Sequence, residues 1–371
     1  MQIITNTNQL FNCLEIAEKA LPVRSSVPTI NNILFEVDEN NLIFSSTNLE
    51  MVITVTMKHN NIESGKILLP PKVVDIMRYF PVPEVNIDIN WENYRIDIFG
   101  GSAHFSLIGA DARDYPVDSF GQVDKSSSFN IEQQKLKNIL KSVIFAASSE
   151  ETRPAFNGIF FSFTDNKLTL TASDTYRLVV KEMMNDRWSF EDKNCLVPAR
   201  VMRELLRIIG DSDQEVVLGI DNKYIAFNFE GINFISRLLE EKYPDVSGVI
   251  PKAYKTRVVF DRKMLEDVIS RAALLAEGKN QAVNLIINNS QLEAKVSAQE
   301  GSMEELIPVK QDGEDIDLHV NSRFVLDILK IMEDKEMIID FHGNDGPLIF
   351  RLLDDHTYLY LVLPIKKVTD L

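Results

Sequence analysis

The sequence predicts an α+β protein of three repeated domains, each made of two strand–helix–three-strand halves. Two observations carry this prediction. A strand-rich segment recurs with a spacing of about 125 residues, and an amphipathic helix followed by three strands recurs along the whole chain. Three copies in 371 residues leave about 120 residues for each, near the usual size of one domain. We therefore expect domains at residues 1–120, 128–250 and 251–371.

The recurring segment is clearest at residues 156–180. Two runs of alternating apolar and polar residues flank Asp165-Asn-Lys167 and predict a β-hairpin, and a third apolar run follows at Leu178–Val180. A shift of 126 residues places 31–50 on this segment, so that Thr47-Asn48 falls on Ser173-Asp174. A shift of 124 in the other direction places 283–297 on it. The repeat is much longer than a solenoid unit, which favours one domain per copy.

Each repeat begins with a short strand and a helix, and its second half begins in the same way. Apolar residues at helical spacing predict first helices within 8–21, 132–147 and 261–279. The second helices are expected at Lys72–Tyr79, Arg200–Ile209 and Arg323–Met332. Pro70 and Pro198 suit a helix start, where the missing N–H costs nothing. Hairpin turns are expected at 100–101, 221–222 and 343–346, and linkers near 118–128 and 251–255.

Composition excludes several classes of protein. Apolar residues make up 45% and charged residues 25% of the chain, as in ordinary globular proteins. No apolar run approaches the roughly 18 residues of a membrane span, and the N-terminus has no signal-peptide pattern. Cys13 and Cys195 lie in apolar patterns, which suits small core residues in a reducing cytoplasm. The histidines lack ligand spacing, so we expect no metal and no cofactor.

The sequence contains no Gly-rich phosphate loop, metal-ligand cluster or nucleophile elbow. Asp111 and Asp114 pair two carboxylates in a polar loop, and Ser173-Asp174 places a hydroxyl beside a carboxylate. Both patterns are more typical of turns than of catalytic sites. An enzyme acting through the loop Ala110–Pro116 is one alternative hypothesis, and a repeat scaffold that binds only proteins is another.

Net charge is −16, but it is unevenly distributed. The helix windows 8–21, 71–80, 132–147, 199–209, 261–279 and 321–336 together carry +3, which leaves −19 for the rest of the chain. Lys and Arg are good helix formers on solvated faces, and that alone explains one basic helix. Repetition, however, would bring the helices to one surface, which would attract a polyanion. The main contributors are Lys135, Lys137, Lys141, Arg200, Arg203 and Arg207.

Several signatures, in order along essentially the whole chain, resemble the bacterial DNA polymerase III beta subunit family, the sliding clamps. Arg24-Ser-Ser-Val-Pro28 with Asn31–Leu34 is similar to the family's Arg-x-x-Leu-Pro-Ile-Leu-x-Asn, and Thr47–Glu50 is similar to Thr-Asp-Leu-Glu. Pro70–Lys72 is similar to the family's Pro-Ala-Arg, and Ser173–Leu178 is similar to its Thr-Asp-Gly-His-Arg-Leu. Tyr243–Asp245 is similar to Phe-Pro-Asp, and Leu363–Ile365 is similar to Met-Pro-Met. The departures are Asn48 for Asp, Thr175-Tyr176 for Gly-His, Gly248 where Arg is frequent, and the extension Lys366–Leu371.

This resemblance implies the DNA clamp fold, with a head-to-tail homodimer closed into a ring around duplex DNA without sequence readout. It implies a non-catalytic accessory subunit of DNA polymerase III that confers processivity. The implied partners are double-stranded DNA and, through short linear peptides, the polymerase alpha subunit, the clamp loader and repair proteins. No membrane partner is implied.

The resemblance also assigns three sets of residues. Basic residues facing the hole are Arg24, Lys72, Arg153 and Arg200, to which helix charge adds Lys135, Lys137, Lys141, Arg203 and Arg207. A peptide-binding cleft comprises Phe156, Ser173, Thr175, Tyr176, Arg177, Leu178, Pro244, Val249, Val362, Leu363, Pro364 and Ile365. The dimer interface joins Phe105 and Leu107 to Leu274 and Leu275. Packing in the core of its own domain explains Leu274 as well as a dimer interface does, and it explains Val362 better than a cleft does. Pro364 is different, because proline cannot donate a hydrogen bond to a strand ladder and so marks a strand edge or end.

Overall fold

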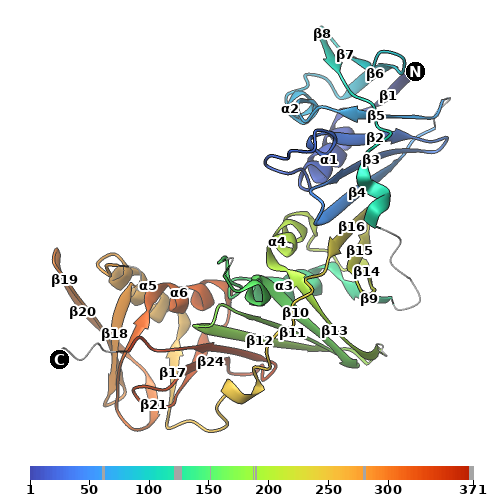
Figure 1. Ribbon diagram of the computed structural model, residues 1–371. Helices are drawn as coiled ribbons and strands as arrows, with labels where there is room; N and C mark the ends of the chain where they lie inside the picture. The colour runs from blue at the N-terminus through green and yellow to red at the C-terminus, as the bar shows by residue number, and fades with distance from the viewer. Residues whose placement is uncertain are drawn as a thin grey trace. The chain divides into compact units, whose positions relative to one another are not determined.

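The structure, a computed structural model, describes residues 1–60, 63–120, 128–150, 152–186, 188, 190–278 and 281–366 (Figure 1). The chain forms two compact units. One unit contains residues 1–137 and 200–238, and the other contains 138–199 and 239–371. The chain passes from the first unit to the second within α3 (Gln133–Ile144) and returns at the start of α4 (Ala199–Ile208).

The first unit contains two antiparallel sheets. The small sheet has the order β1-β6-β7-β8, with β1 Gln2–Asn6, β6 Glu84–Asn90, β7 Arg95–Gly100 and β8 Ala103–Ile108. The large sheet has the order β5-β2-β3-β4-β16-β15-β14-β9. Its strands are β2 Ile33–Val37, β3 Asn41–Thr47, β4 Met51–Lys58, β5 Gly65–Leu69, β9 Phe129–Glu132, β14 Glu215–Ile220, β15 Tyr224–Phe229 and β16 Ile232–Arg237. Helices α1 (Thr7–Glu18) and α2 (Lys72–Arg78) pack together, and α1 also contacts β1, β3 and β4.

The second unit is built in the same way. Its large sheet has the order β13-β10-β11-β12-β25-β24-β23-β17-β21 and its small sheet the order β20-β19-β18-β22. The large-sheet strands are β10 Gly158–Asp165, β11 Lys167–Ser173, β12 Arg177–Met184, β13 Phe190–Pro198, β17 Thr256–Asp261, β21 Lys310–Gly313, β23 Glu336–Phe341, β24 Leu348–Leu352 and β25 Tyr358–Val362. The small-sheet strands are β18 Ala282–Asn288, β19 Gln291–Ala298, β20 Gly301–Pro308 and β22 Ile316–Asn321. Helices α5 (Arg262–Ala273) and α6 (Ser322–Ile331) pack against each other.

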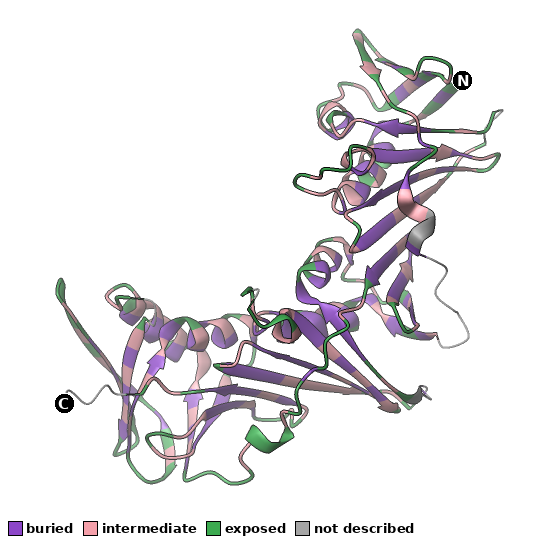
Figure 2. Cartoon of the chain, viewed as in Figure 1, coloured by how far each residue is buried: buried purple, intermediate pink, exposed green. Residues whose placement is uncertain are grey.

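Local sequence explains where the helices begin. Asn6 accepts a hydrogen bond from Gln9 N at 3.1 Å at the start of α1, and Asp261 accepts one from Met264 N at 2.9 Å at the start of α5. Such side-chain caps satisfy amide groups that have no partner inside the helix. Figure 2 shows buried residues along the central strands of both large sheets. In β10, the alternation predicted from sequence buries Ile159, Phe161 and Phe163.

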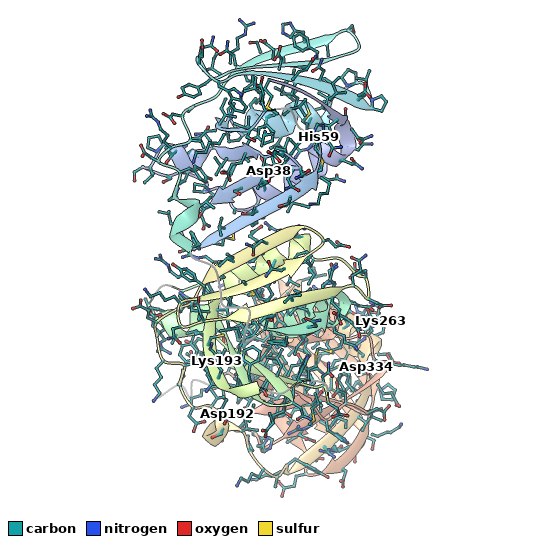
Figure 3. The ribbon with its side chains drawn as sticks, turned by 90° about the vertical axis from the view of Figure 1, so that its right-hand side faces the viewer. Asp38, His59, Asp192, Lys193, Lys263 and Asp334 are labelled. Carbon is teal, nitrogen blue, oxygen red and sulfur yellow. The ribbon has the colours of Figure 1, made fainter. Side chains whose placement is uncertain are left out.

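Turn chemistry also follows the sequence. Asp38, labelled in Figure 3, closes the turn between β2 and β3 by accepting hydrogen bonds from Asn40 N at 2.7 Å and Asn41 Nδ2 at 2.9 Å. The predicted hairpin in the second repeat is confirmed, since β10 pairs with β11 across a turn at Asp165, whose φ is 50°. The expected linker at 118–128 lies mainly outside the described residues.

The prediction of three repeats, each of two strand–helix–three-strand halves, is confirmed, with β21 as an additional strand in the third. The boundaries of the three domains stay a prediction. The strands of the middle repeat are divided between the units, with β9 and β14–β16 in the first and β10–β13 in the second. Each large sheet therefore crosses a junction between repeats. We call the β4–β16 pairing with its surroundings the first junction, and the β12–β25 pairing with its surroundings the second junction.

Candidate functional site

The second junction is organised around the turn Ser173–Arg177. Ser173 Oγ donates to Arg177 O at 2.7 Å and accepts from Thr175 N at 3.1 Å. Asp174 Oδ1 accepts from Tyr176 N at 3.0 Å and from Arg177 N at 3.1 Å. These short polar side chains satisfy the backbone of the turn. The turn therefore holds Thr175 at a φ of 80° and presents Tyr176, which is 62% exposed.

The last strand, β25, lies beside this turn. Arg177 pairs with Val362 in the register of β12 and β25, and Leu363 N donates to Tyr176 O at 2.9 Å. Pro364 has no N–H, so the ladder ends there. Val362 is fully buried, as expected for a core strand, whereas Leu363 is 42% exposed. The strand end thus changes from core to surface within one residue.

A third segment, 243–250, crosses the same region. Tyr243 stacks on Phe160 with centroids 5.2 Å apart and meets Phe156 edge-on at 5.9 Å. Val246 and Ile250 pack against a buried cluster of Leu178, Ile349 and Leu361. The short helix η5 (Ser247–Val249) leaves Val249 57% exposed, and Pro244 is also exposed.

The predicted cleft residues therefore lie in one continuous part of the second unit. Tyr176, Leu363 and Val249 are exposed apolar side chains around a buried floor of Leu178 and Leu361. Val362 pairs with Arg177, so its buried side chain lies on the opposite face of the sheet. The half-buried members are Phe156, Thr175, Pro364 and Ile365, and Ser173 is buried within the turn. Such a surface provides apolar anchoring positions, which suits a peptide held by one or two large apolar residues. Its role as a cleft stays a prediction.

Arg177 differs from what the sequence led us to expect. The resemblance places it among the cleft residues, but it is only 6% exposed. Its Nε donates to Asp174 Oδ2 at 2.9 Å, one terminal nitrogen to Asp327 Oδ2 at 2.5 Å and the other to Phe145 O at 2.6 Å. The guanidinium also lies over the Phe324 ring at 4.5 Å from the centroid. The side chain therefore faces helix α6 instead of solvent.

Sequence reasoning missed these partners of Arg177. Asp327 is 150 residues away in the chain, and no local pattern connects the two positions. The available signal was physical: an arginine that begins a buried apolar strand requires polar partners such as carboxylates nearby. Tyr243 was also missed as a member of the site. Burial raises its pKa, and no described group lies within hydrogen-bond distance of its hydroxyl.

The predicted DNA-facing cations are mostly at the surface. Within the described residues, Arg24, Arg153, Lys141 and Arg203 are exposed and have no ion-pair partner. Four others pair with carboxylates: Lys72 with Asp75 at 3.0 Å, Lys135 with Glu132 at 2.7 Å, Arg207 with Glu204 at 2.8 Å, and Arg200 with Glu50. Exposed pairs of this kind are weak and can exchange a carboxylate for a phosphate. Lys137 is only 13% exposed and pairs with Asp211 at 2.8 Å, so it is the least available of the nine.

The residues predicted for the dimer interface lie at edges. Phe105 is 39% exposed and Leu107 half-buried on β8, the last strand of the small sheet in the first unit. Leu274 is 83% exposed at the end of α5, so it is not a core residue, and Leu275 is half-buried. In the second unit the edge strand β20 carries Leu306, which is 56% exposed. Unprotected edge strands with exposed apolar residues are ready to pair with another chain.

Two kinds of site are not seen in the described residues. They contain no group of three or more His, Cys, Asp or Glu side chains arranged to hold a metal ion. None of the helices in the described ranges has the length and apolar composition needed to span a bilayer. Of the two thiols, Cys195 is buried and Cys13 half-buried, and burial raises the pKa of Cys13 to about 11.

Comparison with known proteins covers nearly the whole chain. Models of the N-terminal, central and C-terminal domains of the DNA polymerase III beta subunit match residues 1–119, 130–245 and 247–366. The beta sliding clamp of Staphylococcus epidermidis is 30% identical, with 99% of each chain covered. The sliding clamp structure from Bacillus subtilis superposes with a TM-score of 0.93 at 27% identity over 99% of each chain. The beta subunit from Thermotoga maritima gives a TM-score of 0.90 at 25% identity, over 98% of this chain and 99% of that one.

Proposed function

Because the chain belongs to the DNA polymerase III beta subunit family, the beta sliding clamps, we propose that two copies form a ring around duplex DNA and tether replication and repair proteins to it. The protein acts as an accessory subunit without catalysis of its own, in the cytoplasm. Its partners are double-stranded DNA and short linear peptides of the polymerase alpha subunit, the clamp loader and repair proteins.

The apolar surface at the second junction is the observation that carries the peptide-binding part of this proposal. Tyr176 and Leu363 are exposed and joined by the Leu363 N–Tyr176 O hydrogen bond. Val249 is exposed on η5, and its chain neighbours Val246 and Ile250 pack against the buried cluster of Leu178, Ile349 and Leu361. An isolated exposed apolar residue needs no explanation, but a group of three around a buried floor is typical of a binding site. Affinity is expected to be modest, because a flexible peptide loses conformational freedom when it binds.

A labelled peptide of the Gln-Leu-Ser-Leu-Phe kind tests this site. Leu363→Asp places a carboxylate in the apolar surface and is expected to abolish saturable binding without changing the oligomeric state. Leu353→Asp is the matched control, because Leu353 is 38% exposed in the same unit but lies outside the proposed cleft. If a folded Leu363→Asp protein binds the peptide as well as the parent does, the cleft is not at this location.

Ring closure is supported by the two edge strands. We expect β8 of one copy to pair with β20 of another, with Leu274 buried beside Phe105 in the closed interface. Leu274→Ala together with Leu275→Ala should give a folded monomer, with a native mass near the 42.2 kDa of one parent chain. Met264→Ala is the control on the same helix, since Met264 is 41% exposed. A double variant that stays dimeric at sub-micromolar concentration contradicts this interface.

DNA binding is expected to be weak, strongly dependent on salt and insensitive to base sequence, since a sliding protein must not hold one register. Replacing Arg24 and Lys72 by Ala should weaken retention on circular duplex and leave the dimer intact. Lys58→Ala with Lys66→Ala removes the same charge from two exposed lysines of the same unit and serves as control. Equal retention of the two double variants across a salt series rules out a specific role for Arg24 and Lys72.

A further inference from the structure

Arg177 connects three elements of the second unit through one side chain. Its hydrogen bonds reach the turn through Asp174, helix α6 through Asp327, and the end of α3 through Phe145 O. Its guanidinium also contacts the faces of the Phe324 and Phe145 rings, at 4.5 and 5.5 Å from their centroids. An arginine is suited to such a place because its planar group donates in several fixed directions at once.

We infer that Arg177 is a positioning residue for peptide binding: it fixes the Ser173–Arg177 turn on helix α6 and so sets the places of Tyr176 and Leu363. This inference rests on the proposed peptide-binding function of the second junction. The Arg177 side chain does not contact the peptide itself, because it is 7% exposed and all three of its nitrogens donate to protein oxygens.

The backbone transmits the position of Arg177 directly to the apolar surface. Arg177 pairs with Val362 in the sheet, and the residues next to these two, Tyr176 and Leu363, share the final hydrogen bond at 2.9 Å. Tyr360 of the same strand donates to Phe324 O at 3.0 Å, so β25 is tied to α6 as well. A shift of the guanidinium away from Asp327 therefore displaces both exposed anchors relative to the buried floor.

Comparison with the first junction shows that the fold does not need this arginine. Met51 occupies the equivalent position after the turn 47–51, is 3% exposed and pairs with Ser236 across the sheet. The turn and the strand pairing form there without a buried charge. Buried ion pairs are often no more stabilising than apolar side chains of similar size. The buried guanidinium is thus better explained by the geometry it imposes than by stability.

The test is Arg177→Met in the full-length protein, which gives the second junction the residue found at the first. We expect the labelled Gln-Leu-Ser-Leu-Phe peptide to bind about tenfold more weakly, a typical coupling between a residue and a site it does not touch. Arg257→Met is the matched control. Arg257 donates to Asp340 at 2.6 and 2.8 Å in the same sheet, outside the cleft, so its loss also removes a partly buried ion pair.

The two variants separate positioning from general destabilisation. Weaker binding by Arg177→Met, with parental affinity in Arg257→Met at a similar loss of Tm, supports the inference. Parental affinity in Arg177→Met, or an equal loss in both variants, overturns it. If Arg177→Met does not fold, Asp327→Asn loosens the contact to α6 alone and must show the same selective loss. If Leu363→Asp also binds the peptide normally, the proposed cleft is wrong. If Leu363→Asp loses peptide binding and Arg177→Met keeps it, only the positioning role of Arg177 is wrong.

Discussion

The first and second junctions share one turn design down to individual hydrogen bonds. At the first junction, Thr47 Oγ1 donates to Met51 O at 2.7 Å, and Asn48 Oδ1 accepts from Glu50 N and Met51 N, each at 3.0 Å. The same pattern at the second junction uses the hydroxyl of Ser173 and the carboxylate of Asp174. The strand pairing is closed in the same way, because Arg237 N donates to Glu50 O at 2.7 Å.

The junctions differ in the packing of the segments that follow Tyr115 and Tyr243, residues 116–120 and 244–250. At the first junction, Val117 and Phe120 are three residues apart, and Phe120 is 2% exposed in a cluster with Val52 and Ile235. At the second junction the packed residues, Val246 and Ile250, are four apart. The additional residue, Val249, is turned to the surface. The second junction therefore differs from the first in two exposed apolar side chains, Val249 on the longer segment and Leu363 at the strand end before Pro364.

Phe120→Ala has one of the two largest effects that this comparison predicts. Removing a buried phenyl ring leaves a cavity, so the first unit should lose about 3–5 kcal/mol of its free energy of unfolding. Hydrogen exchange of the amides in β4 and β16 measures the loss locally, which matters because a chain of two units need not unfold in one step. Peptide affinity at the second junction should not change.

Tyr79→Ala is the control for this substitution, since Tyr79 is an aromatic residue of the same unit but is 80% exposed. Its cost should stay within about 0.5 kcal/mol, as for most surface substitutions. If Phe120→Ala costs no more than Tyr79→Ala, the first junction is not filled by Phe120, and the proposed difference between the junctions disappears.

Met51→Arg gives the first junction the residue of the second without its partners. Asn48 stands where Asp174 stands, so the new guanidinium lacks the carboxylate of the turn. A buried charge without a partner costs about 3–5 kcal/mol, and the same hydrogen-exchange measurement should detect it. Adding Asn48→Asp supplies a carboxylate and should restore part of the loss. A Met51→Arg protein as stable as the parent means that water reaches this position.

Sequence predicted the repeats, the helices and the positions of the turns, because these depend on residues close together in the chain. The sharing of strands between repeats was not predictable, since β4 pairs with β16 and β12 with β25 across distant segments. The burial of Arg177 was not predictable for the same reason: its partner Asp327 comes from another repeat. Lys137 was chosen for its charge, but Asp211, which pairs with it, comes from the loop after α4.

The smallest predicted effect distinguishes two tyrosines that precede the linkers. Tyr115 and Tyr243 are each 7% exposed, but Tyr115 donates to Asn32 O at 3.0 Å, while no described group lies within hydrogen-bond distance of the Tyr243 hydroxyl. Tyr115→Phe should therefore cost about 1 kcal/mol, the net worth of one hydrogen bond, because it leaves a carbonyl unpaired. Tyr243→Phe should cost nothing or stabilise its unit slightly.

The pH dependence provides a second measurement for the same pair. Burial raises the pKa of both phenols above the usual value of about 10. The unfolded chain then releases these protons more readily than the folded chain. The free energy of unfolding is therefore unaffected by the two phenols below about pH 10 and falls as the pH rises above it. Each Phe variant lacks one of the two phenols, so its free energy of unfolding should decline less than that of the parent above about pH 10. A Tyr243→Phe protein that is destabilised as much as Tyr115→Phe at neutral pH shows that the Tyr243 hydroxyl has a partner, such as an ordered water, and that the two junctions are closer in chemistry than their protein contacts indicate.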